Sequence, residues 1–246
     1  MRRRVTIQTV SLSLFRFQSA WARLWVLGQM GAARLDFGRM PEARFWKLCG
    51  SGTGEGFTPV PNTRVWAILA VWDDERTARR LTRESSVYRR WRARSDDSWT
   101  VYLGPTSARG NWSGKNPFAA EWAASTSTAG TPLAALTRAT IKPSALPRFW
   151  GKEPDVSRAI GADPNVIFKI GIGEVPWFHQ VTFSIWPDAE SMTAFARKDG
   201  PHARAIRAVR DGKWFREELY ARFQVLGSVG SWEGHNPLEK TERQAA

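Results

Sequence analysis

The sequence is poor in cysteine and in long apolar segments. Cys49 is the only cysteine among 246 residues, which excludes an internal disulfide framework and is typical of a reducing compartment. Residues 66–72 (WAILAVW) are among the longest apolar runs and fall far short of the roughly 18 residues that span a bilayer. Polar residues interrupt the segment after the basic start MRRR, so a signal peptide is disfavoured. We therefore predict a cytoplasmic protein.

Histidine is also scarce, and this restricts the chemistry. Only His179, His202 and His235 are present. Their wide spacing disfavours a non-haem iron site, and neither paired carboxylates nor a Ser-His-Asp set stands out. The glycine-rich segment 49–56 (CGSGTGEG) lacks the lysine and hydroxyl of a phosphate-binding loop, and no predicted helix follows it. We interpret this segment as a loop between strands.

Charge of one sign dominates the chain. The net charge is +13, from 36 lysines and arginines against 23 aspartates and glutamates. Basic surface gives affinity for phosphate, but no nucleic-acid-binding motif accompanies it, so nucleic acid is disfavoured as a partner. An acidic protein or an anionic membrane surface would account for the charge equally well. The oligomeric state stays open.

One loop sequence occurs twice. Residues 110–118 (GNWSGKNPF) match residues 230–238 (GSWEGHNPL), with Lys115 in the first copy where His235 stands in the second. Other matches follow in the same order. They pair residues 19–25 with 144–150, Lys47 with Lys169, Trp72 with Trp186, and Asp74 with Asp188. Matches in the same order predict a tandem repeat of about 120 residues.

Each half has the pattern of a βαββαβ unit. Expected strands are 5–17, 44–49, 65–72 and 98–104 in the first half, and 134–141, 166–172, 179–186 and 215–226 in the second. Expected helices begin near Ser19 and Ser144 and cover 74–93, 188–198 and 201–211. This predicts an α+β fold in which tandem ferredoxin-like units pair their sheets, as in dimeric α/β barrels. The predicted parts are 1–118, a linker 119–133, 134–238, and a disordered tail 239–246.

Two of the histidines have simple structural interpretations. His235 lies where the twin loop carries Lys115, which indicates an exposed position. His179 shares a strand face with Val181, Phe183 and Ile185, which favours a structural histidine. Cys49 could supply a thiolate ligand, but single cysteines are more often small buried residues.

His202 has a different pattern. It begins a helical stripe with Ala205, Ile206 and Val209, so its imidazole is expected to point inward. Either a core histidine or a ligand to a metal or haem fits this pattern. Three arginines near the stripe would suit haem propionates: Arg204, Arg207 and Arg210. In the first half, Tyr88 takes the matching position.

Tryptophan is abundant, with 14 residues. Most are expected to fill the core. Several fall near predicted element ends, where they could line a long apolar pocket: Trp46, Trp112, Trp150, Trp177 and Trp232.

Four segments together carry a family resemblance. SLSLFRF (11–17), FWKLCGSGTGEGFTPVPNTRVWAILAVW (45–72), VYRRWRA (87–93) and DGPHARAIRAVRDGKWFREELYARF (199–223) resemble the spheroidene monooxygenases of purple bacteria. The similarity covers essentially the whole chain, and the block at 45–72 is its most specific part.

The resemblance implies a haem-dependent oxygenase. Such an enzyme would oxidise C2 of acyclic carotenoids to a ketone, using O2 and electrons from reduced ferredoxin. By analogy with related barrels, His202 would be the iron ligand, with His179 and Cys49 as alternatives. Contact with a membrane surface, where carotenoids reside, would suit the basic charge. A haem- or apolar-ligand-binding barrel without catalysis, or a different haem reaction, are the alternatives.

Overall fold

In the computed structural model, residues 8–54, 58–118, 131–151, 163–197 and 212–239 are described. Within these described ranges lie eight strands and four labelled α-helices, with a short 3-10 helix η1 after the fifth strand. The elements are β1 Thr9–Arg16, α1 Ala20–Gly38, β2 Phe45–Gly52, β3 Pro61–Trp72, α2 Glu75–Glu84, α3 Ser86–Arg92, β4 Asp97–Gly110, β5 Leu133–Ile141, η1 Pro143–Ala145, β6 Phe168–Gly173, β7 His179–Trp186, α5 Ala189–Arg197 and β8 Phe215–Ser231.

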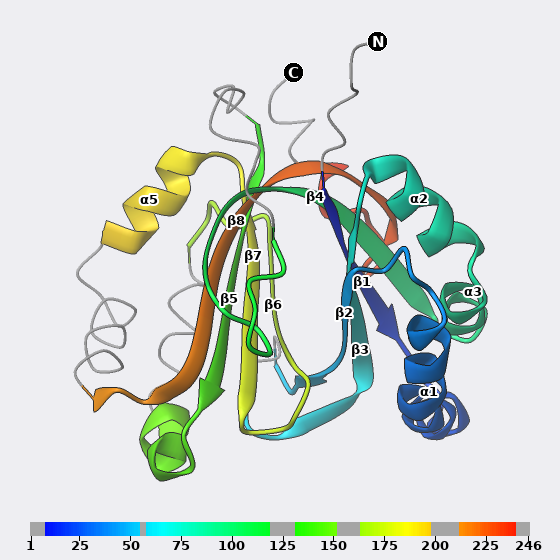
Figure 1. The fold of residues 1–246 in the computed structure, drawn as a ribbon, viewed down its shortest axis with the longest axis horizontal. Coiled ribbons are helices and arrows are strands. Elements are labelled where there is room, and N and C mark those ends of the chain that lie inside the picture. The colour runs from blue at the N-terminus through cyan, green and yellow to red at the C-terminus, as the bar shows by residue number, and fades with distance from the viewer. Residues whose placement is uncertain (1–7, 55–57, 119–130, 152–162, 198–211, 240–246) are drawn as a thin grey trace.

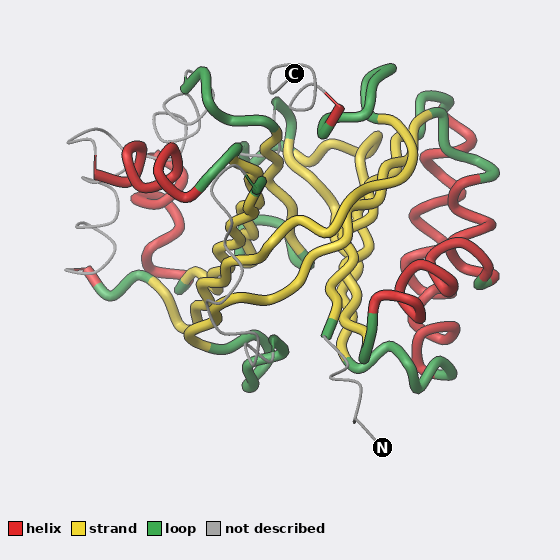
Figure 2. Tube along the Cα trace, turned by 90° about the horizontal axis from the view of Figure 1, so that it is seen from above, coloured by secondary structure: helices red, strands yellow, loops and turns green. Residues whose placement is uncertain are grey.

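The strands form one closed antiparallel barrel in the order β1-β3-β2-β6-β7-β5-β8-β4. Read from β4, the first four strands follow the order β4-β1-β3-β2, and the last four follow β8-β5-β7-β6, so both runs share one order. Helices α1, α2 and α3 cover the outside of the first run, and α5 lies outside the second (Figure 1). Figure 2 shows the strands between these two helical layers.

Strand alternation separates an inner from an outer face. On β1, Leu12 and Leu14 point into the barrel, whereas Ser11, Ser13 and Phe15 point toward the helices. The buried serines are satisfied there, because Trp72 Nε1 donates to Ser11 Oγ at 2.8 Å and Ser13 Oγ lies 2.7 Å from Thr100 Oγ1. The barrel interior is a continuous apolar core that includes Leu12, Leu14, Leu69, Val101, Leu136, Phe183 and Leu219.

The helix starts follow from their capping residues. Ser19 accepts a hydrogen bond from the N–H of Ala22 at 3.1 Å, as predicted for the start of α1. Asp74 caps α2 through the N–H of Thr77 at 2.8 Å, and Asp188 accepts from the N–H of Ser191 at 2.7 Å at the start of α5. The paired aspartates of the two sequence halves therefore have the same local role.

Several predicted bounds were wrong. β4 continues to Gly110 and β8 to Ser231, because these two strands pair with each other from Ser98–Ser231 to Gly110–Leu219. β3 begins at Pro61, whereas the helical segments predicted for 74–93 are confirmed as α2 and α3, which meet at Ser85. The helix predicted from Ser144 starts as η1 and continues as helix over 146–151. The predicted helix 201–211, residues 119–130 of the linker and residues 240–246 of the tail lie outside the described residues.

Candidate functional site

An ion cluster lies inside the barrel near one end. It consists of Lys47 on β2, Arg138 on β5, Glu174 just after β6 and Glu217 on β8. Lys47 Nζ lies 2.8 Å from Glu174 Oε1, and Arg138 Nη2 lies 3.8 Å from Glu174 Oε2. Arg138 also pairs with Glu217 and is almost fully buried. The cluster joins a strand of the first run to three segments of the second.

Both carboxylates of the cluster stay ionised. Burial would raise the pKa of Glu174, but hydrogen bonds from His179 and Lys47 outweigh it and hold the pKa at about 2. Burial likewise works to raise the pKa of Glu217, yet the N–H groups of Gly114 and Ser113 and the charge of Arg138 lower it overall. Neither group can donate a proton at neutral pH, so the cluster supplies fixed charge.

The repeated loop forms the same turn at two places. Trp112 forms an antiparallel β-bridge with Lys115, and Trp232 forms one with His235. The two central residues of each turn have positive φ. Gly114 and Gly234, at 79° and 81°, suit this backbone because they lack a Cβ. The first turn is fixed to the ion cluster, since Glu217 accepts from the N–H of Gly114 at 2.7 Å and Trp112 Nε1 donates to Glu174 at 3.0 Å.

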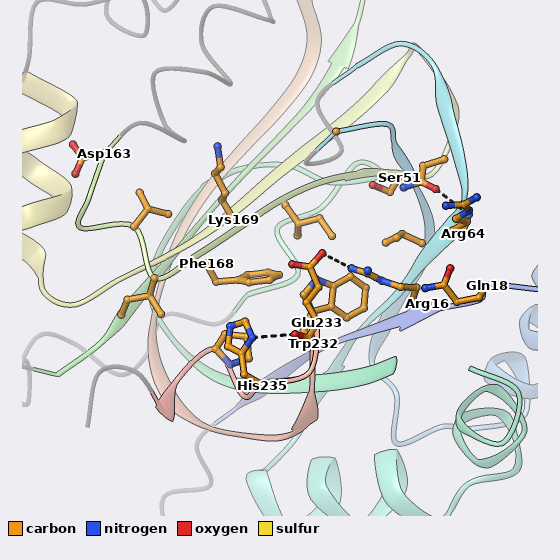
Figure 3. A pocket seen from close by; sticks show the side chains of 17 residues that line it. Arg16, Gln18, Ser51, Arg64, Asp163, Phe168, Lys169, Trp232, Glu233 and His235 are labelled. Atoms are coloured by element: carbon orange, nitrogen blue, oxygen red, sulfur yellow. Dashed lines mark hydrogen bonds and ion pairs between the residues drawn. The ribbon is translucent and has the colours of Figure 1, made fainter. Parts of the chain in front are cut away.

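A polar pocket of about 470 Å³ lies beside the second turn (Figure 3). Arg16 Nη2 donates to Glu233 Oε1 at 2.6 Å, and the guanidinium of Arg16 lies 4.7 Å from the ring centre of Trp232. His235 Nδ1 lies 3.3 Å from the carbonyl oxygen of Glu233, and the residue is exposed, as predicted. Arg64, Lys169 and Asp163 also line this pocket, so three cationic and two anionic side chains face it.

An apolar pocket of about 280 Å³ lies on the outside of the barrel at its weakest seam. β2 and β6 pair only through Gly50 with Gly173 and Ser51 with Ile172. The pocket wall is formed by residues of α1, by the two strands β2 and β6 that meet at the seam, and by Trp150 near the end of the described range 131–151. Its lining includes Leu27, Trp66, Trp150, Ile172, Trp177 and Gln180.

Trp177 at the pocket rim is held in an unusual conformation. Its φ of 66° is uncommon for a bulky residue and indicates backbone strain. Two hydrogen bonds hold it: Trp177 Nε1 donates to the carbonyl of Pro59 at 2.8 Å, and Trp150 Nε1 donates to the carbonyl of Trp177 at 3.1 Å. The indole itself is half exposed. Strain maintained by such contacts is a feature of ligand-binding loops.

Gln180 brings a polar group to the same pocket. Its side chain is 8% exposed, and Nε2 has no hydrogen-bond partner among the residues that the structure describes. A buried amide without a partner costs free energy, so it indicates a place where a ligand or water accepts a hydrogen bond from it. Gln180 alternates with Val181, which faces the core, and therefore lies on the outer face of β7.

The outer faces of the two runs of strands differ at corresponding places. In the first run, Phe15 pairs with Trp66 and Ser13 with Ile68. The corresponding positions of the second run are found by matching Trp186 with Trp72. There the paired residues are small or polar: Ala139 with Gln180 and Thr137 with Thr182.

The first outer face is filled by aromatic side chains. Phe15 packs edge-on to Trp91 with ring centres 5.2 Å apart, and Tyr88 packs against Phe37. All four belong to one buried layer under α1, α2 and α3. Burial raises the pKa of Tyr88, so its hydroxyl stays protonated.

The structure describes only some of the predicted site residues. His202, Arg204, Arg207 and Arg210 lie outside the described residues. His179 begins the strand whose alternate residues Val181, Phe183 and Ile185 face the barrel core, as the strand pattern predicted. The Nδ1 atom of His179 lies 3.3 Å from Glu174 Oε2. Cys49 is fully buried, and burial raises its pKa well above its ordinary value, with the charge of Glu174 adding to this. Its thiol is therefore protonated and behaves as a small core residue.

The sequence did not indicate the ion cluster or Gln180. Strand alternation would have placed Arg138 on the same face as Ala134 and Leu136, which is a signal for a buried charge. Nothing local in the sequence brings Glu174 to Lys47. In the described part of the chain, no group of three histidine, cysteine or carboxylate side chains is placed to hold a metal ion.

Solved structures define the fold class of this protein. An aldoxime dehydratase in complex with butyraldoxime superposes with a TM-score of 0.62, at 10% identity over 98% of this chain and 87% of its own. A second aldoxime dehydratase gives a TM-score of 0.57 at 12% identity, over 92% and 83% of the two chains. At such identities the likeness concerns the fold alone. The chain is thus an α/β barrel protein with a polar and an apolar pocket.

Sequence relatives are more specific. Spheroidene monooxygenase from Cereibacter sphaeroides is 58% identical over 94% of this chain and 71% of its own length. Spheroidene monooxygenase from Rhodobacter capsulatus is 53% identical, over 96% and 98%. That from Rubrivivax gelatinosus is 34% identical, over 87% and 80%. No protein-family model matches the chain. The chain belongs to the spheroidene monooxygenase family, which confirms the resemblance carried by its sequence blocks.

Proposed function

We propose that this protein is a haem-dependent monooxygenase that oxidises C2 of an acyclic carotenoid to a ketone, using O2 and reduced ferredoxin. Family membership supports a carotenoid monooxygenase. The observation that carries the rest is the outer face of β5 and β7, where the side chains of Ala139, Thr137 and Thr182 are small and the amide of Gln180 has no hydrogen-bond partner among the described residues. In this proposal each run of four strands is one ferredoxin-like unit, and only the second unit holds the cofactor.

The described residues fit a planar apolar cofactor at this face better than elsewhere. A large ring system needs a flat surface to pack against, and the small side chains of Ala139 and Thr137 would offer one. The equivalent face under α2 and α3 is filled by Phe15 and Trp91. Haem would supply the activation of O2 when bound.

His202 is the proposed iron ligand. His179 is already beside Glu174, His235 is in an exposed turn, and the Cys49 thiol is protonated. His202 has the inward helical pattern that an axial ligand needs. Three flanking arginines would hold the propionates as fixed cationic forks, namely Arg204, Arg207 and Arg210.

The apolar pocket is the proposed site for the end of the polyene chain. Trp66, Trp150 and Trp177 present the flat apolar surfaces that suit a conjugated hydrocarbon. The Gln180 amide would donate a hydrogen bond to the oxygen introduced at the reacting carbon, so that the alcohol product of the first oxidation is held for the second. Tight walls would also exclude water from the reacting end.

The reaction balances over two turns. Each turn consumes one O2, two electrons and two protons, inserts one oxygen atom into a C–H bond and releases one water. Two insertions at the same carbon give a gem-diol, which loses water to leave the ketone. Reduced ferredoxin is the proposed electron donor, and its acidic surface would be attracted by the net charge of +13. Ferredoxin association should then weaken strongly as ionic strength rises, and an association rate insensitive to salt would contradict this donor.

An absorption spectrum of the protein expressed with haem supply tests the cofactor. We expect a Soret band that His202→Ala abolishes and that the matched change His235→Ala, in the exposed turn, leaves intact. A haem-free protein, or a band retained in His202→Ala, would overturn the assignment.

Co-expression with a pathway that makes spheroidene tests the reaction. The expected product is a red-shifted carotenoid that has gained one oxygen atom and lost two hydrogen atoms. A haem protein that leaves the carotenoid unchanged would instead favour a haem-binding barrel without catalysis or a different haem reaction.

A further inference from the structure

Helix α1 presents large apolar side chains to the outside. Trp21 is 82% exposed, Leu24 61%, Leu27 48% and Leu35 67%. These residues recur at helical spacing on the face opposite the buried Val26, Ala33 and Phe37. A surface helix normally turns polar residues outward, so an apolar outer face indicates that something covers it.

The charges around this face are positive. Arg34 is exposed beside Leu35, and Arg23 lies at the edge of the same face. The carboxylate within α1, Asp36, sits at the inner edge and is paired with Arg90 at 2.5 Å. The outward face of α1 therefore combines apolar surface with cationic groups.

The exposed face of α1 continues into the apolar pocket. Leu27 belongs to the face and also lines the pocket, together with Met30 from the same helix. At the far rim, Val60 and Trp177 are both at least half exposed, and the indole of Trp177 bonds to the neighbouring Pro59. In Figure 1, α1, the start of β3 and the connection from β6 to β7 lie along the same lower edge of the molecule.

We propose that this continuous surface docks onto an anionic lipid bilayer, with the apolar pocket opening into it. The docking surface consists of Trp21, Leu24, Leu27, Leu35, Val60 and Trp177. The inference rests on the proposed function, because a bilayer is where an apolar carotenoid resides and the docked pocket would receive it without passage through water.

Charge complementarity selects a bilayer rather than a second copy of this chain. Two copies with a net charge of +13 each would repel. An anionic membrane attracts the same charges, and each basic residue near its surface strengthens binding. Tryptophan at the rim of the surface suits the boundary between headgroups and acyl chains.

Vesicle flotation of the full-length protein tests the proposal. We expect binding to vesicles of phosphatidylglycerol and phosphatidylcholine, and weaker binding to phosphatidylcholine alone or at high salt. The double change Leu24→Gln with Leu35→Gln keeps good helix formers and should lower the partition coefficient about tenfold or more, since it removes two apolar side chains from the contact. Arg34→Gln should reduce binding to anionic vesicles only.

A matched control is Val229→Thr, which alters another exposed apolar residue on β8 outside the docking surface. This control should bind vesicles like the unchanged protein. All variants should unfold at the same thermal midpoint as the unchanged protein. No binding to anionic vesicles at low salt, or equal binding by the double variant, would overturn the proposal. A dimer that the double variant dissociates, without vesicle binding, would show that a second copy covers the face.

The test separates this proposal from the proposed function, because flotation needs neither haem nor carotenoid. Conversion of detergent-solubilised carotenoid without vesicle binding would refute the docking surface alone. Vesicle binding by a protein that converts no carotenoid would refute the proposed reaction and leave the surface standing.

Discussion

On the outer face of β1 and β3, Phe15 lies opposite Trp66, whereas at the corresponding place on β5 and β7 Ala139 lies opposite Gln180. The barrel interior differs much less, since Leu12 pairs with Leu69 in one run and Leu136 with Phe183 in the other. The interior must be filled in both runs to close the barrel. The outer layer does not have to be filled by side chains if a ligand occupies the same volume.

The most direct test of this difference is to place a bulky side chain, like those on β1 and β3, on the outer face of β5 and β7. Ala139→Phe places a phenyl ring where the cofactor is proposed to lie. We expect haem affinity to fall roughly a thousandfold, equivalent to about 4 kcal/mol, because the ring and the cofactor compete for one volume. Titration with haem followed by the Soret band measures this.

The control is Val229→Phe, which adds a similar ring at an exposed place on β8. It should leave haem binding unchanged. An unaltered Soret titration in Ala139→Phe, with native circular dichroism, would place the cofactor elsewhere.

The two runs of strands are linked by charge as well as by pairing, and Glu174→Gln tests that link. The pKa of Glu174 is lowered from its ordinary value of 4.5 to about 2, so its ionised form stabilises the fold at neutral pH by on the order of 3 kcal/mol. This contribution is present above pH 4.5 and is lost as the pH falls toward 2.

Chemical unfolding at several pH values should therefore show a large loss in Glu174→Gln at pH 7 that shrinks toward pH 2. Glu218→Gln serves as the control, because Glu218 is exposed and faces away from the cluster. A loss that stayed the same at every pH would mean that packing, not charge, explains the effect.

Tyr88→His sharpens the comparison from the first run, because the sequence matches Tyr88 with His202. An imidazole alone should not create a cofactor site there, since Phe15 and Trp91 already fill the layer. In the His202→Ala background, we expect Tyr88→His to show no Soret band and to lose about 2 kcal/mol in stability, from lost packing and a buried polar ring. Tyr88→Phe, which keeps the aromatic ring, should lose much less. Haem binding by Tyr88→His in the His202→Ala background would show that a histidine is sufficient.

Local patterns in the sequence predicted much of the fold. The strand 179–186 was placed correctly because its inner residues Val181, Phe183 and Ile185 alternate without interruption. Ser19 marked the start of α1, and the positions of Asp74 and Asp188 matched two helix caps. Strand ends were less predictable, since β4 and β8 extend wherever each finds a partner, beyond their own apolar residues.

The candidate site was less accessible from sequence. Lys47 and Lys169 illustrate this, because they match in the sequence repeat but lie on opposite faces of the sheet. Lys47 pairs with Leu69, which faces the core, whereas Lys169 pairs with Ser184 on the outer face. A shift of one residue reverses the face of a side chain, and sequence similarity alone does not fix register. The apolar pocket depends on the short pairing of β2 with β6, a contact between the halves that no local pattern encodes.

The smallest effect concerns α1, the helix of the first run whose outer face is bare. A Cβ added at Gly28 would meet no atom within 4 Å, so Gly28→Ala should stabilise the protein by roughly 0.5–1 kcal/mol through helix propensity alone. If α1 docks on lipid, the added methyl group should leave vesicle binding unchanged or slightly stronger. If instead two copies pack through Gly28 and Gly31, the methyl group would hold the helices apart and weaken a dimer. Sedimentation equilibrium and flotation of this one variant therefore distinguish the two coverings of α1.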